Sequence, residues 1–190
     1  MRFTHLILDR DGVLNEEAPD RGYVTRPEAW RWIPGSLEAL ALFARAGCRI
    51  SVATNQSGVG RGLMTSKDLD TVHARMTSEA RAAGGRIDAV FACVHAPTDG
   101  CDCRKPAPGL IAASVAASDI PRAQTLVVGD AARDLDAARR AGVAAVLVRT
   151  GKGAAAAAAL SQEGVRVYDD LYALARELTA GRAADGSNRP

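Results

Sequence analysis

Leu6-Ile7-Leu8-Asp9-Arg10-Asp11-Gly12 is the stretch that decides the fold. Three consecutive apolar residues are typical of a central strand in a parallel sheet, which is buried on both faces. Asp9 and Asp11 follow directly, and catalytic groups of open α/β sheets collect at the carboxyl ends of the strands. Because strand side chains alternate in direction, we expect the two carboxylates to lie side by side and share a Mg²⁺. The four residues Asp-x-Asp-Gly alone are equally compatible with an acidic turn.

Three later segments place further polar chemistry after apolar runs or in a loop. They are Thr54-Asn55 after Ile50-Ser51-Val52-Ala53, Arg104-Lys105-Pro106 in a loop, and Gly129-Asp130 with Asp134 after Leu126-Val127-Val128. A hydroxyl and an ammonium donate to phosphate oxygens, and a third carboxylate completes a metal site. Singly these residues are compatible with a turn, a solvated cation and a helix cap. Together they indicate phosphoryl chemistry.

In order and placement, these segments resemble the four motifs of the haloacid-dehalogenase-like (HAD) phosphatase superfamily, over about residues 5–153. The resemblance implies that Asp9 is a nucleophile that forms an aspartyl-phosphate. Asp11 would be the general acid and base, protonated while Asp9 is ionised because burial and a nearby carboxylate raise one of the two pKa values. Thr54 and Lys105 would hold the phosphoryl oxygens. Mg²⁺ would bind Asp9, the backbone carbonyl of Asp11, and Asp130.

Three of the four cysteines fall within one short stretch, as Cys93-Val94-His95 and Cys101-Asp102-Cys103. Three thiolates and one imidazole form a closed tetrahedral zinc set, so we expect a structural Zn²⁺ on Cys93, His95, Cys101 and Cys103. The alternatives are a disulfide framework or three unrelated buried thiols. The charged first twenty residues do not form a secretory signal, which disfavours disulfides and favours the reducing cytoplasm. The zinc would pin the base of the loop that carries the next two residues, both cations.

The zinc loop and its flanks resemble one subgroup of the superfamily, which contains heptose bisphosphate phosphatases and histidinol-phosphate phosphatases. Residues 54–62, TNQSGVGRG, favour the heptose family. That family implies removal of the 7-phosphate from D-glycero-D-manno-heptose 1,7-bisphosphate, which gives heptose 1-phosphate for nucleotide-activated heptose and lipopolysaccharide core precursors. Ala131, where the heptose enzymes commonly have lysine, departs from their pattern. The short zinc loop is shared with the histidinol-phosphate phosphatases, which stay the alternative.

The same resemblance predicts a set of substrate-binding residues. They are Arg10, Asp20, Gly22, Tyr23, Asn55, Gln56, Ser57, Arg61 and Arg104. The second phosphate of a sugar bisphosphate needs a cation, for which Arg61 and Arg104 are the candidates, and Arg104 would compensate for Ala131. No room is left for a cap domain, so loop 15–34 and the zinc loop must exclude water. Trp30 and Trp32 in the first loop either form a wall of the site or pack against the sheet.

Helical and strand patterns alternate along the chain. This alternation predicts a doubly wound, Rossmann-like α/β fold with helices on both faces of a parallel sheet, in one domain over residues 1–180 with a frayed tail at 181–190. The expected elements are helices at 36–46, after the capping box of Thr65 and Asp68, at 134–141 and around Leu171, Leu174 and Leu178, a helix or linker at 154–160, and a strand at 145–148. The buried face of the second helix would carry Leu69, Val72, Met76, Ala80 and Ala83, and Cys48 would be buried.

Composition disfavours other classes of protein. The 24 basic and 22 acidic residues are spread along the chain, so the net charge of +2 offers no field for nucleic acid. No apolar tract approaches the ~20 residues of a membrane span. We therefore expect a monomeric cytoplasmic enzyme that acts on a small molecule. A receiver-type signalling domain and a zinc-ribbon module stay in view, but the spacing of Asp9 and Asp11 argues against the first and the strand-end residues against the second.

Overall fold

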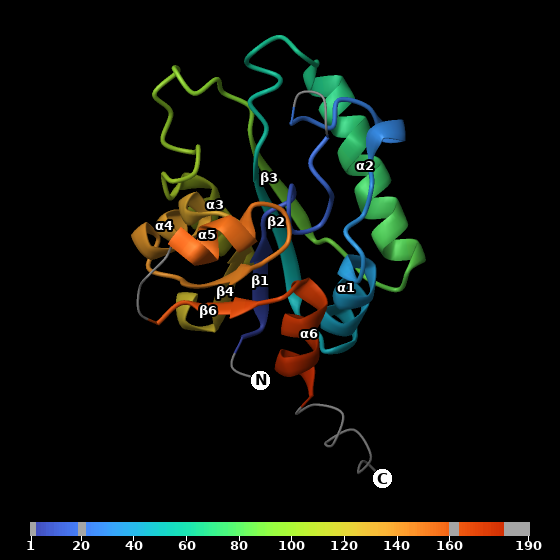
Figure 1. Ribbon diagram of the computed structural model, residues 1–190, viewed down its shortest axis with the longest axis vertical. Coiled ribbons are helices and arrows are strands. Elements are labelled where there is room, and N and C mark those ends of the chain that lie inside the picture. The colour runs from blue at the N-terminus through green and yellow to red at the C-terminus, as the bar shows by residue number, and fades with distance from the viewer. Residues whose placement is uncertain (1–2, 19–21, 160–163, 181–190) are drawn as a thin grey trace.

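The computed structural model describes residues 3–18, 22–159 and 164–180, and the tail predicted at 181–190 lies outside them. A six-stranded sheet, ordered β3-β2-β1-β4-β5-β6, forms its centre (Figure 1). Its strands are β1 His5–Leu8, β2 Arg49–Asn55, β3 Ala89–Cys93, β4 Thr125–Gly129, β5 Ala144–Val148 and β6 Arg166–Tyr168. Every pairing is parallel. The predicted doubly wound sheet is therefore confirmed.

Helices cover both faces of this sheet, with α1, α2 and α6 on one side and α3, α4 and α5 on the other (Figure 1). Their bounds are α1 Ser36–Arg45, α2 Ser66–Ala82, α3 Gly109–Ser118, α4 Ala132–Arg140, α5 Gly153–Ala159 and α6 Leu171–Thr179. The segment predicted as a helix or linker is thus the helix α5. The helix predicted from residue 134 begins two residues earlier, because Asp134 is the N3 residue whose side chain accepts from the backbone N–H of Ala131.

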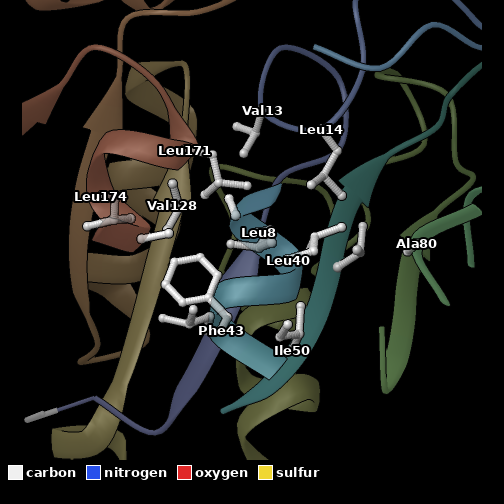
Figure 2. Packing of buried hydrophobic residues seen from close by; sticks show 14 of the residues in the cluster. Leu8, Val13, Leu14, Leu40, Phe43, Ile50, Ala80, Val128, Leu171 and Leu174 are labelled. Atoms are coloured by element: carbon white, nitrogen blue, oxygen red, sulfur yellow. The ribbon is translucent and has the colours of Figure 1, made fainter. Parts of the chain in front are cut away.

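The alternation of strand side chains divides the core in two. Leu6 and Leu8 belong to the cluster that packs against α1 and α6, whereas Ile7 belongs to the cluster formed with α3 and α4. Figure 2 shows the first cluster, where Phe43 of α1 lies beside Val128 of β4 and Leu174 of α6. Burial of such side chains stabilises the fold by ~1.5–3 kcal/mol each.

In helix α2, the helical spacing of apolar residues predicted the buried face correctly except at the last position. Both hydrogen bonds of the predicted capping box form, and Leu69, Val72, Met76 and Ala80 are buried. Ala83 is exposed, so its assignment to the buried face is wrong. It is the C-cap residue, beyond the last helical turn, and there the helical period no longer fixes its direction. Cys48 is fully buried, as predicted.

Loop 15–34 docks on α2 through its two tryptophans. Trp30 is buried and meets Trp32 edge to face, with ring centroids 5.1 Å apart. Trp32 donates from Nε1 to Glu79 Oε2 of α2 at 2.6 Å. Of the two roles considered, the structure places both rings in packing contacts, and neither ring lines the pocket described below.

The described residues leave no inserted domain beside the sheet. Between β1 and α1 they form a loop with one 3-10 turn, Pro27–Ala29, and between β2 and β3 they form α2. The predicted absence of a cap domain is therefore consistent with what the structure describes. In the same part of the chain, no helix combines the length and apolar character that crossing a membrane requires.

A buried histidine at the start of β1 predicts a pH-dependent stability. His5 lies within hydrogen-bond distance of Thr125 Oγ1 (3.3 Å), Ser51 Oγ (3.0 Å) and Ser114 Oγ. Burial, helped by Arg49, lowers the pKa of His5 to about 4 from its ordinary 6.5. His5 therefore binds a proton below about pH 6.5 in the unfolded chain, but only below about pH 4 in the folded chain. The free energy of unfolding consequently falls as the pH falls through this window.

We expect His5→Gln, which keeps one donor and one acceptor, to flatten this dependence. Between pH 7.5 and 5.0, the free energy of unfolding of the wild type should fall by about 2 kcal/mol more than that of the variant. Urea unfolding at both pH values measures the difference, because other titrating groups contribute equally to the two proteins. Equal losses in both would show that His5 does not titrate in this window.

Candidate active site

The carboxyl ends of the central strands bring the predicted residues together. Leu8 is in register with Val52 of β2 and Val128 of β4, so Asp9 emerges between the ends of these two strands. Thr54 lies within the last residues of β2, and Asp130 directly follows β4. The sheet order reverses at β1, which is the position where open α/β sheets bind ligands.

Three carboxylates converge here around one lysine. One oxygen each of Asp9, Asp130 and Asp134 lie within 4.8 Å of one another, and all three side chains are buried. Lys105 Nζ contacts Asp9 Oδ1 at 2.9 Å and Asp134 Oδ1 at 2.6 Å, and it donates to the backbone carbonyl of Ala53. Lys105 therefore offsets part of the negative charge of the cluster.

Burial and the neighbouring charges together shift the pKa values of this cluster. Burial raises the pKa of Asp9 to about 7 against the opposing effect of Lys105, and Asp134 and Asp130 add to the rise. Burial also raises the pKa of Asp130. The pKa of Lys105 is raised, because the attraction of Asp134 and Asp9 outweighs its burial. A divalent cation among these carboxylates would favour their ionised forms.

The surroundings of Asp130 fit a Mg²⁺ ligand. Its Oδ1 is buried and has no hydrogen-bond partner among the described residues, while Oδ2 accepts from the backbone N–H of Lys152 at 2.8 Å. Gly12 and Gly151 pack so closely on this carboxylate that an added Cβ would lie 1.9 and 2.3 Å from Oδ2. A buried oxygen held without a donor, beside two further carboxylates, is the oxygen-rich arrangement that Mg²⁺ prefers.

The carboxylate of Asp11 does not belong to the group that Asp9 forms with Asp130 and Asp134, although strand alternation led us to expect that it shares a Mg²⁺ with Asp9. β1 ends at Leu8 and the chain turns, so the carboxylate of Asp11 is not among the three that converge. Its Oδ1 accepts from Arg10 and Asn15, and its Oδ2 accepts from Gln56 Nε2 at 2.7 Å. Although burial raises the pKa of Asp11, these donors lower it overall. Of the pair, Asp9 has the raised pKa and Asp11 the lowered one, the reverse of the predicted order.

A pocket of about 260 Å³ opens above the nucleophile candidate. Nine of the predicted catalytic and substrate-binding residues line it: Asp9, Asp11, Gly22, Tyr23, Thr54, Asn55, Ser57, Arg61 and Arg104. The hydroxyl groups of Tyr23 and Ser57, which both line the pocket, form a hydrogen bond of 2.8 Å. The Nη1 atom of Arg104 is buried without a hydrogen-bond partner among the described residues, which leaves a donor available for a ligand. Asp20 lies outside the described residues.

Two predicted substrate-binding side chains, Arg10 and Gln56, are fully buried and are not among the residues that line the pocket. Gln56 Nε2 instead donates to both Asp11 and Thr54 Oγ1, the latter at 2.8 Å. Asn55 has a second task beside lining the pocket. Its amide pairs with the backbone of Lys105, through Nδ2 to the carbonyl and the Lys105 N–H to Oδ1, each at 3.0 Å. These hydrogen bonds hold the side chains of Asp11 and Thr54 and the backbone of Lys105 in place.

Sequence reasoning missed three residues that line the pocket: Glu17, Arg133 and Lys152. Lys152 and Glu17 form an ion pair at the rim, 2.5 Å apart. Arg133 lies in the first turn of α4, with Nη2 4.0 Å from Asp9 Oδ2, and attraction to Asp9, Asp134 and Asp130 overcomes burial and raises its pKa. Arg133 thus supplies a cation two residues after Ala131, the position at which the heptose enzymes commonly have a lysine.

The four predicted zinc ligands meet in one cluster. Cys93, His95, Cys101 and Cys103 each offer one ligand atom, and all four atoms lie within 4.8 Å of one another. The three Sγ–Sγ distances are 3.1, 3.5 and 3.6 Å, near the ~3.8 Å edge of a tetrahedron with Zn–S bonds of ~2.3 Å. None of these cysteines forms a disulfide. The donor set fits Zn²⁺.

Backbone contacts join the zinc cluster to the pocket. The N–H of Gln56 donates to the carbonyl of Cys93 at 2.7 Å, and the N–H of Gly60 donates to that of Val94 at 2.9 Å. Gly60 packs so tightly here that an added Cβ would lie 2.6 Å from the backbone nitrogen of Ala96. Displacing the zinc loop therefore displaces the segment that carries Ser57 and Arg61.

Comparison with known proteins agrees with this geometry. Residues 102–174 match the family model described as HAD-hydrolase-like. Over 174 residues the chain is 43% identical to the D-glycero-beta-D-manno-heptose-1,7-bisphosphate 7-phosphatase of Bordetella bronchiseptica, covering 91% of this chain and 96% of the relative. The enzyme of the same name from Pseudomonas putida is 42% identical over 91% of this chain and 98% of its own length.

Solved structures give the same result. The crystal structure of D,D-heptose 1,7-bisphosphate phosphatase from B. bronchiseptica, complexed with magnesium and phosphate, superposes with a TM-score of 0.88 at 42% identity, covering 94% of this chain and 99% of that one. The sheet, the converging carboxylates and these likenesses define a phosphoric monoester hydrolase of the HAD class. Within that class, the chain belongs to the family of the D-glycero-beta-D-manno-heptose-1,7-bisphosphate 7-phosphatases.

Proposed function

We propose that this chain removes the 7-phosphate of D-glycero-beta-D-manno-heptose 1,7-bisphosphate and leaves the 1-phosphate in place, as its relatives are named for. Asp9 attacks the phosphorus, the bond from phosphorus to the sugar oxygen breaks, and an aspartyl-phosphate forms. Asp11 gives its proton to the departing oxygen and later accepts one from the water that hydrolyses the aspartyl-phosphate. The negative charge of the bound phosphate favours the protonated form of Asp11 against the donors that surround it.

Other groups of the site hold the transferring phosphoryl group. Gln56 occupies the acceptor side of the Thr54 hydroxyl, so its O–H is directed to another partner, for which a phosphoryl oxygen is suited. Lys105 offsets charge beside Asp9. Mg²⁺, held by Asp9, Asp130 and the backbone carbonyl of Asp11, would supply the charge that lets an anionic nucleophile approach an anionic phosphate.

The observation that carries the proposal is the set of cations around one small pocket. Arg61, Arg104, Arg133 and Lys152 line it together with the nucleophile candidate. A bisphosphate brings two dianionic groups, which this set can bind at once. Histidinol phosphate carries an amino cation in place of the second phosphate, and these side chains would repel it.

We further propose that the chain holds one structural Zn²⁺ and works in the cytoplasm as a monomer. The zinc site supports the location, since its thiolates must stay reduced to bind metal. The pathway we propose is the synthesis of nucleotide-activated heptose for lipopolysaccharide core precursors, which requires heptose 1-phosphate.

Arg133 should contribute to substrate binding in the way that the sequence suggested for Arg61 and Arg104. We expect Arg133→Ala and Arg104→Ala each to lower kcat/KM for the bisphosphate by roughly 10–100-fold, the effect of losing one charge-assisted contact of ~1.4–2.7 kcal/mol. Steady-state kinetics measures the loss. Arg139→Ala is the matched control, because Arg139 is on the same helix but exposed and paired with Asp136. A loss in the control as large as in Arg133→Ala would assign the effect to α4 as a whole.

The proposal is tested by phosphate release from a panel of substrates with and without Mg²⁺. The panel contains the β and α anomers of the heptose bisphosphate, fructose 1,6-bisphosphate and histidinol phosphate. We expect the β anomer to have the highest kcat/KM, no activity after removal of Mg²⁺, and a product that retains its 1-phosphate. A higher kcat/KM for histidinol phosphate would refute the assignment.

A further inference from the structure

Arg10 has a buried guanidinium that the reaction, as described above, does not use. Its side chain is fully buried although it lies between the two catalytic aspartates in sequence. Nη2 and Nε donate to the same oxygen, Asp11 Oδ1, at 2.8 and 3.3 Å. Asn15 Nδ2 donates to that oxygen as well, at 2.9 Å. Oδ1 thus accepts from two side chains through three N–H groups, whereas Oδ2 accepts only from Gln56 Nε2, at 2.7 Å, so a proton shared with a substrate resides on Oδ2.

The guanidinium is itself held by residues of the surrounding structure. Its remaining terminal nitrogen, Nη1, lies 3.2 Å from His73 Nε2 on α2. Burial and the charge of Arg10 keep the His73 ring neutral, with a pKa of about 4, so that Nε2 can accept. The Arg10 guanidinium carbon also lies over the Trp30 ring, 5.8 Å from its centroid. All three nitrogens of the Arg10 guanidinium therefore have a partner, and one face of the group lies on the Trp30 ring.

We propose that Arg10 is a positioning residue that fixes the Asp11 carboxylate with Oδ2 toward the leaving oxygen, and that His73 of α2 fixes Arg10 in turn. This inference rests on the proposed function in one respect, the role of Asp11 as proton donor. An Arg10 side chain released from His73 can rotate away from Asp11, and Asp11 then loses two of the three donors on Oδ1. Proton transfer to the leaving oxygen requires such a fixed geometry.

The experiment uses His73, because it touches Arg10 from outside the pocket and borders a groove on α2 instead. His73→Gln retains an acceptor for Arg10, and His73→Leu does not. Each variant, saturated with Mg²⁺ and Zn²⁺, is compared on two substrates, the preferred sugar phosphate of the wild type and p-nitrophenyl phosphate. The nitrophenolate leaves as an anion and needs no proton, whereas a sugar alkoxide needs one.

We expect His73→Leu to lower kcat/KM for the sugar phosphate about tenfold through kcat, with KM nearly unchanged, and to leave kcat/KM for p-nitrophenyl phosphate within twofold. His73→Gln should stay within threefold of the wild type on both substrates. Arg10→Lys should show the same selective loss more strongly, because a lysine cannot donate to Asp11 and His73 in the same fork geometry.

Equal losses on the two substrates, no loss on either, or a His73→Gln variant as impaired as His73→Leu would each overturn the inference. Thermal melting of the variants accompanies the kinetics, since a purely structural role would change stability and both substrates together. A wild type that prefers a different sugar phosphate would refute only the heptose assignment, and the same ratio is then measured with the preferred substrate.

Discussion

Asp9→Asn is expected to lower kcat by about 10⁴-fold or more while the fold remains intact. The substitution replaces the attacking oxygen by an amide and removes one of the three converging charges. Lys105 keeps its partner Asp134, 2.6 Å away, so the buried cation is not left unpaired. The variant should therefore melt near the wild-type temperature, and it should form no aspartyl-phosphate in rapid-quench experiments.

Asp136→Asn is the matched control for this loss, because Asp136 is a more exposed carboxylate on α4 that pairs with Arg139. It should keep full activity. An Asp9→Asn enzyme within tenfold of the wild type would refute the nucleophile assignment. Asp11→Asn should differ from both, since it should still form phosphoenzyme from p-nitrophenyl phosphate but hydrolyse it slowly.

Cys101→Ser is expected to lose the zinc and much of the stability of the fold. One zinc per chain should copurify with the wild type. If zinc is present at about a thousand times its dissociation constant, its loss removes about 4 kcal/mol of stability, which lowers the Tm of a domain of this size by about 10 °C. Elemental analysis and thermal melting measure the two effects.

The second consequence of this substitution should be catalytic. Because the loop at 56–60 is hydrogen-bonded to the backbone at Cys93 and Val94, loss of zinc should lower kcat/KM at temperatures where the variant is still folded. Cys48→Ala is the control, since Cys48 lies outside the cluster and should leave the zinc content unchanged. Freshly reduced wild type without zinc would contradict the assignment of the cluster.

The strands of the centre were predictable because burial on both faces leaves a strong local signal. Leu6-Ile7-Leu8 and Leu126-Val127-Val128 are continuous apolar runs, and both are strands of the sheet. Helix α3, with the sequence GLIAASVAAS, was not predicted because its apolar residues lie all around it and show no helical period. Strand β6 has only three residues, none fully buried, and left no pattern to detect.

The site was predictable in its composition but not in its inner contacts. Motif order places Asp9, Thr54 and Asp130 at strand ends, where the structure has them. The chain turns after Leu8, so the carboxylate of Asp11 stays outside the group of Asp9, Asp130 and Asp134, and strand alternation could not foresee this. The family resemblance predicted that Arg10 and Gln56 bind substrate, yet both side chains are fully buried and make contacts within the protein. Adjacent residues can point in different directions, because the direction of each side chain depends on partners that are distant in sequence, such as His73 for Arg10.

The order of the strands in the sheet determines when each strand can find its neighbours during synthesis of the chain. β1 pairs with β2 early, but its other neighbour, β4, begins at Thr125, so a ribosome must add more than a hundred residues before β1 is covered on both edges. At ~5–20 residues per second this interval lasts on the order of ten seconds. During it, the edge that carries Leu6, Ile7 and Leu8 can pair with other nascent chains. Slowed translation just before Thr125 should therefore lower the soluble yield of a protein whose finished form is unchanged.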